Sequence, residues 1–333
     1  MLKYIVKRLL NLIPVIFIIS IVIFGTVKGM PGDPVDAYLG MGSKATPEQK
    51  QQIREELGLD KSLPEQYVIW VGNLAKGELG TSTKFKLPVS EIIGDYVWNT
   101  FLLNLVSLVI GIGLSIPIGI KQATKKFSKF DNFWTVFSLL GVSVPTFFFA
   151  LILIFFVALP SGVIPVNGMR TPDLAVFGYD NIFQEIGDVA LHMLLPTIVL
   201  AFGNFATFSR YVRSSMIDVI NQDYVRTARA KGLKEKTVIY RHAFKNALIP
   251  LVTPRPGHRN SDSRIIPSLF SGAMILESVF LWPGLGKILI EAISGQDQSI
   301  ITACLMFSAI LMVLGNLLSD ILYSVVDPRV KVE

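Results

Sequence analysis

The side chains most suited to binding chemistry are concentrated in residues 223–253, a basic connector between two strongly apolar segments. A chain this apolar is expected to keep its loops short, yet this loop carries seven cations with a glycine, Gly232, among them. The cations are Arg226, Arg229, Lys231, Lys234, Lys236, Arg241 and Lys245. One interpretation is a solvated cytoplasmic loop that follows the positive-inside rule of membrane proteins. The other is a docking element for a soluble partner.

The local pattern of the connector predicts a helix–turn–helix. Residues 210–230 are expected to form one helix that continues from the preceding apolar segment. Gly232 suits the left-handed position after a helix, with Leu233 as the apolar residue that follows it. A second helix is expected from about Lys234 to Asn246, with one face formed by Val238, Ile239, Ala243 and Phe244. Such a finger would present apolar side chains and cations at its tip. A loop that only supplied positive charge would not need this order.

Motifs for catalysis, nucleotide binding or metal binding are missing from the sequence. Residues 284–287 read GLGK, but they lack the upstream glycine and the Ser/Thr of a phosphate-binding loop. The single cysteine, Cys304, excludes an intramolecular disulfide, and the three histidines do not form a metal spacing. Paired carboxylates, which mark proton-coupled carriers, are absent from the apolar segments. We therefore expect a chain that is not an enzyme, hydrolyses no ATP and binds no cofactor or metal.

Composition places the chain in the membrane class. Charged residues make up 17% of its 333 residues, below the soluble average of about 25%. The net charge of +6 is expected to set membrane topology rather than to bind nucleic acid. Six apolar segments meet the length of roughly 20 residues needed to cross a bilayer. They are residues 9–27, 97–120 with Pro117, 133–159 with Pro145, 191–209 with Pro196, an interrupted segment somewhere between 247 and 276, and 299–319.

The short loops predict the orientation. Residues 210–245 hold nine basic and three acidic residues, and residues 121–132 are also basic. Residues 160–190 are acidic, with Arg170 as their one basic residue. This alternation predicts an all-α membrane protein of six transmembrane helices with both termini in the cytoplasm. The expected parts are residues 1–27 with the first span, an external segment 28–96, a transmembrane core 97–320 that includes the cytoplasmic loop 210–246, and a cytoplasmic tail 321–333.

The external segment is expected to fold. Thr46 is a suitable N-cap, Pro47 suits the first helical position, and Gly58 suits the end of that helix. A second helix is expected over residues 64–74. We interpret the segment as a structural cap over the outer mouth.

Polar side chains within the apolar segments are few. Most are expected to form hydrogen bonds between helices, and some to line a substrate path. The candidates for the path are Asn104, Ser143, Asn204, Thr207 and Asn316.

The order of these features resembles a known family. Residues 224–233, YVRTARAKGL, with residues 241–243, RHA, closely resemble the cytoplasmic coupling (EAA) loop of ABC importer permeases, in the peptide-permease branch. The generic Glu-Ala-Ala triplet is absent, but the glycine is present. Weaker similarities cover nearly the whole chain. They are residues 32–34 (GDP), 55–60 (EELGLD), 77–80 (GELG), 143–147 (SVPTF), 277–286 (ESVFLWPGLG) and 327–329 (DPR).

The resemblance implies a transport mechanism in the plasma (inner) membrane of a prokaryote. Two permeases, usually non-identical, form the pathway, two ATPase subunits bind Mg-ATP and dock on the coupling loops, and an external binding protein delivers peptide. In this chain the contact would centre on residues 229–236. The implied coupling residues are Tyr224, Arg226, Ala228, Arg229, Ala230, Lys231, Gly232, Leu233, Lys234 and Lys236. Importers of nickel, glutathione or oligosaccharide are neighbouring alternatives. An ATP-independent channel or carrier and a membrane-anchored scaffold are alternatives of other classes.

Residues 254–264, PRPGHRNSDSR, conflict with the expected fifth span. Arginine or aspartate near the centre of a span costs about 2.5–3.5 kcal/mol each, or about 10 kcal/mol together here, and each flanking leucine or isoleucine returns only about 0.5 kcal/mol. One explanation is a genuine polar break followed by a shorter span from residue 265 to about 281. The other is a slip and restoration of the reading frame, because shifted codons can encode Leu-Val-Leu-Val-Ile. Resequencing the gene distinguishes them.

Overall fold

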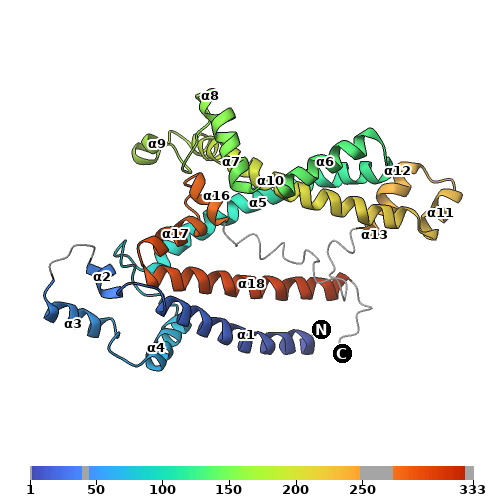
Figure 1. The fold of residues 1–333 in the computed structure, drawn as a ribbon. Helices are drawn as coiled ribbons and strands as arrows, with labels where there is room; N and C mark the ends of the chain where they lie inside the picture. The colour runs from blue at the N-terminus through green and yellow to red at the C-terminus, as the bar shows by residue number, and fades with distance from the viewer. Residues whose placement is uncertain (1, 40–44, 248–272, 327–333) are drawn as a thin grey trace. The chain divides into compact units, whose positions relative to one another are not determined.

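Helices form nearly all the regular structure in the part of the chain that the structure describes. A computed structural model describes residues 2–39, 45–247 and 273–326 (Figure 1). Within these ranges four helices are long and apolar enough to cross a membrane, or five if a bent helix pair counts as one span. The all-α membrane class expected from composition is therefore confirmed.

The long helices coincide with four of the expected spans. They are α1 (Leu2–Lys28), α5 (Val89–Thr124), α10 (Ile182–Ile220) and α18 (Gln298–Val326). Most of the expected fifth span, the polar stretch 254–264 and the tail 327–333 lie outside the described residues. The described part of the chain therefore supports four or five spans, and the count of six stays a prediction.

The expected third span is not one helix. The helix α6 (Lys129–Ser143) and the segment Thr146–Ser161 are bent by 104° relative to each other. That segment comprises α7 (Thr146–Leu153), a π-helix (Ile154–Ala158) and α8 (Leu159–Ser161). Pro145 has no backbone N–H, and the residue before it, Val144, has the extended conformation that proline imposes on its neighbour. The apolar segment expected over residues 133–159 is therefore broken at Pro145.

Two compact units make up the chain. Among the described residues, the first holds 2–39, 45–100, 273–278 and 283–317, and the second holds 101–247, 279–282 and 318–326. The first unit contains α1, the small helices α2 (Pro34–Leu39), α3 (Pro47–Glu56) and α4 (Leu63–Lys76), the start of α5, and α17 (Leu285–Ser294). Most of α16 (Met274–Val279) and of α18 also belongs to it.

The helices expected between the first two spans are present. Thr46 caps α3 with a reciprocal pair of hydrogen bonds: its Oγ1 accepts from the Gln49 N–H at 3.3 Å, and its own N–H donates to Gln49 Oε1 at 2.9 Å. Gly58 follows that helix with a φ of +65°. The second helix, α4, begins and ends within two residues of the prediction.

The core of the first unit forms where several helix ends meet. Val27 of α1, Ile93 of α5, Ile288 of α17 and Ile300 of α18 are buried in one cluster. Asp297 caps α18 by accepting from the Ile300 N–H at 3.2 Å, and it also accepts from the Ser82 hydroxyl at 2.6 Å. The buried carboxylate thus fastens the turn before α5 to the start of α18.

The second unit is built around α10, against which α5 and α6 pack closely (Figure 1). A Cβ at Gly119 of α5 would lie 2.8 Å from Val212 Cβ, and a Cβ at Gly111 would lie 2.6 Å from Asn204 Cβ. A Cβ at Gly141 of α6 would lie 2.7 Å from Ala206 Cβ. Small residues at such positions let the backbones of membrane helices approach each other. Glycine is therefore required along both interfaces.

We predict that Gly119→Ala destabilises the protein, because the added methyl group overpacks the α5–α10 contact at a cost of about 1–3 kcal/mol. The matched control is Gly113→Ala on the same helix, where an added Cβ meets nothing within 4 Å. Thermal unfolding of the detergent-solubilised protein measures both. A loss of thermal stability as large for Gly113→Ala as for Gly119→Ala would contradict the close contact.

Candidate functional site

The basic element, residues 223–247, begins at a break rather than as a continuation of α10. That helix ends at Ile220, and α11 (Asp223–Ala230) starts after Gln222, whose backbone is extended. The amide of Asn221 donates to the Ile217 carbonyl at 3.1 Å, and that of Gln222 donates to the Asp218 carbonyl at 3.3 Å. These side chains satisfy carbonyls at the end of the helix. The expected single helix over residues 210–230 was therefore wrong.

The turn at Gly232 is confirmed. Lys231 is the C-cap of α11, and Gly232 adopts a φ of +73°, which disfavours side chains with a Cβ. The Gly232 N–H donates to the Arg229 carbonyl at 2.9 Å, one of the two hydrogen bonds of a Schellman stop. The chain then returns through α12 (Glu235–Thr237), a π-helix (Val238–Phe244) and α13 (Lys245–Ala247). The second helix matches the prediction except for its π-helical centre.

The apolar side of the basic element faces inward. Val225 and Ala228 of α11 are buried with Val238 and Ala243 of the returning helix. These four side chains pack in one cluster with Ile120 of α5 and with Val212 and Met216 of α10. Ile239 and Phe244 are partly buried against the same cluster. The expected shared face exists, but it attaches the element to its own long helices and is not presented at the tip.

Most of the predicted coupling residues are exposed. Ala228 is buried, whereas the others line the outer surface; they are Tyr224, Arg226, Arg229, Ala230, Lys231, Gly232, Leu233, Lys234 and Lys236. Leu233 is 40% exposed at the turn and provides an apolar contact among the cations. Within the described part of the chain, the lysines of this set form no ion pair.

One ion pair crosses the turn of the basic element. Arg229 Nη2 donates to Glu235 Oε1 at 2.8 Å. The hydrogen bond from Arg229 lowers the pKa of the Glu235 carboxyl, and the same bond raises the pKa of Arg229. Both side chains are largely exposed, so solvent screens the pair. It links α11 to the start of the returning helix across the turn.

A buried polar network that the sequence did not indicate braces the helices that carry the basic element. Asp131 of α6 is 1% exposed, and its two oxygens accept from Arg213 Nε at 2.6 Å and Nη2 at 2.8 Å. Ser209 of α10 donates to Gln122 Oε1 of α5 at 3.1 Å, and its oxygen lies 3.2 Å from the Ser138 hydroxyl of α6. The network joins α5, α6 and α10. In the sequence, Asp131 lies in the basic stretch 121–132, and no local pattern marks it as buried.

A further buried carboxylate, that of Glu277, lies in the first unit. Glu277 Oε2 accepts from the N–H groups of Gly286 at 2.7 Å and Lys287 at 3.2 Å. Its Oε1 accepts from the Thr100 hydroxyl at 2.9 Å, and Thr100 in turn accepts from the Leu285 N–H at 2.8 Å. Burial raises the pKa of Glu277, although these hydrogen bonds favour the ionised form. The carboxylate satisfies the free N–H groups at the start of α17.

The glycines of the 284–287 run are explained by this carboxylate. A Cβ at Gly284 would lie 2.5 Å from the Glu277 carboxyl carbon, and a Cβ at Gly286 would lie 2.4 Å from Met274 Cα. The run is therefore a tight structural turn that leaves no room for phosphate.

The candidate pathway residues lie on three helices of the second unit and on α18. Asn104 is half-buried on α5, and Ser143 is exposed beside the bend that follows α6. Asn204 and Thr207 lie three residues apart on α10, half-buried and exposed, respectively. Asn316 is exposed on α18. Their role in a path stays a prediction.

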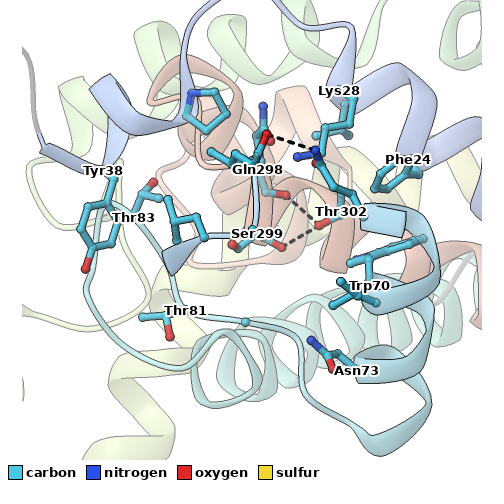
Figure 2. Close-up of a pocket in the computed structure, with 18 of the residues that line it drawn as sticks. Phe24, Lys28, Tyr38, Trp70, Asn73, Thr81, Thr83, Gln298, Ser299 and Thr302 are labelled. Carbon is cyan, nitrogen blue, oxygen red and sulfur yellow. Dashed lines mark hydrogen bonds between the residues drawn. The ribbon is translucent and has the colours of Figure 1, made fainter. Parts of the chain in front are cut away.

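A cavity of about 480 Å³ lies in the first unit (Figure 2). Aromatic side chains, including Phe24 and Trp70, line it together with Lys28 and Asn73. Hydroxyl groups at the start of α18, including Thr302, complete its wall. Its lining is mixed in character and contains no group of three or more metal-ligating residues among those described.

Long apolar helices that carry a braced, structured basic element define an integral membrane protein. Residues 115–332 match the family of binding-protein-dependent transport system inner membrane components, and residues 1–102 match the N-terminal membrane component of the same systems. The chain belongs to this family. It is a non-catalytic transport subunit of the bacterial inner membrane.

Full-length relatives are peptide permeases. The chain is 40% identical over 332 residues to the oligopeptide transport system permease protein AppB of Bacillus subtilis (strain 168), with 99% of this chain and 100% of the relative covered. It is 35% identical over 347 residues to the dipeptide transport system permease protein DppB of Escherichia coli (strain K12), with 99% of each covered. A di/tripeptide permease of Pseudomonas aeruginosa (strain UCBPP-PA14) is 35% identical over 349 residues, again with 99% of each covered. The resemblance to the peptide-permease branch is confirmed.

We predict that Asp131→Asn loosens the basic element by weakening its brace. The charge-assisted bonds to Arg213 are lost, which lowers the free energy of unfolding by about 1–3 kcal/mol, toward the lower end because Arg213 is 25% exposed. Trypsin cleavage within residues 223–247 should then become faster. Asp173→Asn, at an exposed acid of the same unit, is the control. Equal cleavage rates in the two variants would refute the bracing role.

Proposed function

We propose that this chain is a pathway-forming permease subunit of an ATP-driven peptide importer, and that its basic element receives the movement of ATPase subunits. The observation that carries the substrate is full-length similarity to oligopeptide and dipeptide permeases. The observation that supports the coupling role is the form of the element. It is a folded pair of helices with a buried apolar side and an exposed basic side.

The geometry divides the coupling residues into two roles. The exposed side chains, with Leu233 at the turn, would contact the ATPase subunit. Ala228 is buried with Val225, so it is a positioning residue that holds α11 against the returning helix. A displacement applied at the turn then moves α10 as well, because burying each valine of this cluster contributes about 1.5–3 kcal/mol to keeping the parts together.

The partners follow from what this chain lacks and from its family. The sequence has no phosphate-binding loop, so Mg-ATP would bind to two partner ATPase subunits. A binding-protein-dependent system also requires an external binding protein, which would deliver the peptide. A second permease subunit, a non-identical homologue of this chain, would complete the pathway. The half-buried and exposed polar residues Asn104, Asn204 and Thr207 are candidates to line it.

The proposed topology has six spans with both termini in the cytoplasm. The four long helices and the bent pair supply five of them. The sixth would come from residues 247–276. The excess of cations in the loops before α6 and after α10 supports a cytoplasmic position for the basic element.

We predict that Leu233→Asp weakens binding of the ATPase subunits about tenfold or more, because a charge replaces the apolar contact at the centre of the surface. Co-purification of the ATPase subunits with the detergent-solubilised permease measures the effect. The control is Leu87→Asp, at an exposed leucine outside the basic element. ATPase recovery unchanged by Leu233→Asp would count against the proposed contact.

We predict that Gly232→Val reduces ATP-dependent uptake of a labelled dipeptide severalfold in proteoliposomes that contain the complete transporter. A β-branched residue is strained at a φ of +73°, whereas asparagine tolerates it. Gly232→Asn should therefore retain most uptake.

Uptake that needs no ATP would indicate a channel or carrier. If nickel, glutathione or an oligosaccharide inhibits this uptake and unlabelled peptides do not, the substrate is not a peptide.

A further inference from the structure

The helix α4 packs against the part of α1 that crosses the membrane. The Tyr67 hydroxyl lies 2.8 Å from Ser20 Oγ. The ring of Phe24 lies 5.5 Å from that of Tyr67 and 5.7 Å from that of Trp70, measured between centroids. The ring of Phe17 lies 6.3 Å from Tyr67. Figure 1 shows α4 against the C-terminal half of α1.

These contacts fix the depth of α4. The apolar span of α1 runs from Leu9 to Lys28. Ser20 precedes Lys28 by eight residues, which corresponds to about 12 Å along the helix at a rise of 1.5 Å per residue. Half the hydrocarbon thickness of a bilayer is only about 15 Å. Tyr67 therefore reaches well into the hydrocarbon, and α4 lies at the level of acyl chains.

The surface of α4 is suited to that level. Tyr67 and Trp70 face α1, and beside them runs an apolar strip that α1 does not cover. This strip consists of Pro64, Val68 and Ala75, all exposed, and Val68 is 68% exposed. Their spacing of four and seven residues places them on one side of the helix.

Two polar side chains of α4 face the cavity of the first unit and not the strip. Gln66 and Asn73 line the cavity of about 480 Å³, and Figure 2 shows Asn73 and Trp70 at its wall with Lys28 opposite. At about 100° per residue, Val68 lies about 160° around the helix from Gln66 and about 140° from Asn73. Gln66 and Asn73 of α4 thus face a hollow while the strip faces away from it. The exposed Glu65 lies about 60° around the helix from Val68 and borders the strip.

We infer that α4 is embedded in the acyl chains of the bilayer, with the strip Pro64, Val68 and Ala75 in contact with lipid. On α1, Ile18 and Val22 are each 60% exposed and lie about 160° around the helix from Ser20, on the side away from α4. Helices with an apolar side bury that side at the boundary between headgroups and acyl chains. That the leaflet is the outer one rests on the proposed topology. The segment between the first two spans is then anchored in the membrane and is not a free cap above it.

Nitroxide labels test the inference in the complete transporter, reconstituted in nanodiscs of phosphatidylcholine and phosphatidylglycerol. Single cysteines replace Val68 or Ala75 in a Cys304→Ala background, with Asn73→Cys as the control on the cavity side. Labels at residues 68 and 75 should collide with oxygen and be shielded from a water-soluble nickel chelate, and the label at residue 73 should show the reverse. Uptake activity verifies that each variant is folded.

Two results would overturn the inference. Nickel-chelate access at residues 68 and 75 equal to that at residue 73 would mean that the strip faces water. Shielding from both reagents would mean that protein, such as the second permease subunit, covers the strip. A separate label distinguishes an error in the proposed topology from an error in the embedding. If an impermeant maleimide labels Lys76→Cys only from the cytoplasmic side, α4 lies in the inner leaflet, and the inference that it is embedded still holds.

Discussion

The burial of one apolar cluster on which the basic element rests is the constraint from which the proposed mechanism follows. Val225 and Val238, from the two helices of the element, meet Val212 and Met216 of α10 in a common core. Exposed cations alone would leave the element free to move independently of the membrane helices. Because the apolar side is buried, the exposed side becomes the outer surface of a rigid unit. The Asp131–Arg213 pair strengthens this by joining α6 to α10.

Two further constraints shape the helices around that unit. Glycines permit α5 and α6 to approach α10 so closely that a Cβ at Gly119 or Gly141 would overlap a neighbouring side chain. Pro145 bends the third apolar segment by 104°. In the first unit, Glu277 holds the start of α17 through backbone N–H groups. Each is a local packing or hydrogen-bonding requirement, and together they explain why glycine, proline and a buried acid occur in segments that are otherwise apolar.

The sequence predicted the features that depend on short-range signals. Thr46, Gly58 and Gly232 act as helix caps and stops where expected, and the long apolar helices follow hydropathy. The break at Asn221 and Gln222 was missed because two amide side chains satisfy the helix end, and no proline or glycine marks it. The partnership of Asp131 with Arg213 was missed because it joins residues 82 positions apart. Tertiary contacts also decided that the apolar face over residues 238–244 points inward. The coupling, pathway and topology assignments stay predictions.

The rigidity of the basic element is tested most directly by a distance within the second unit during transport. Nitroxide labels at Lys125→Cys, between α5 and α6, and Lys234→Cys, at the turn, in a Cys304→Ala background report this distance by pulsed electron resonance. The reconstituted transporter is measured without nucleotide and with ATP trapped in the ATPase subunits. We predict one unchanged narrow distance distribution in both states. A shift or broadening with ATP would show that the element hinges at residues 221–222, and would contradict its role as a rigid lever.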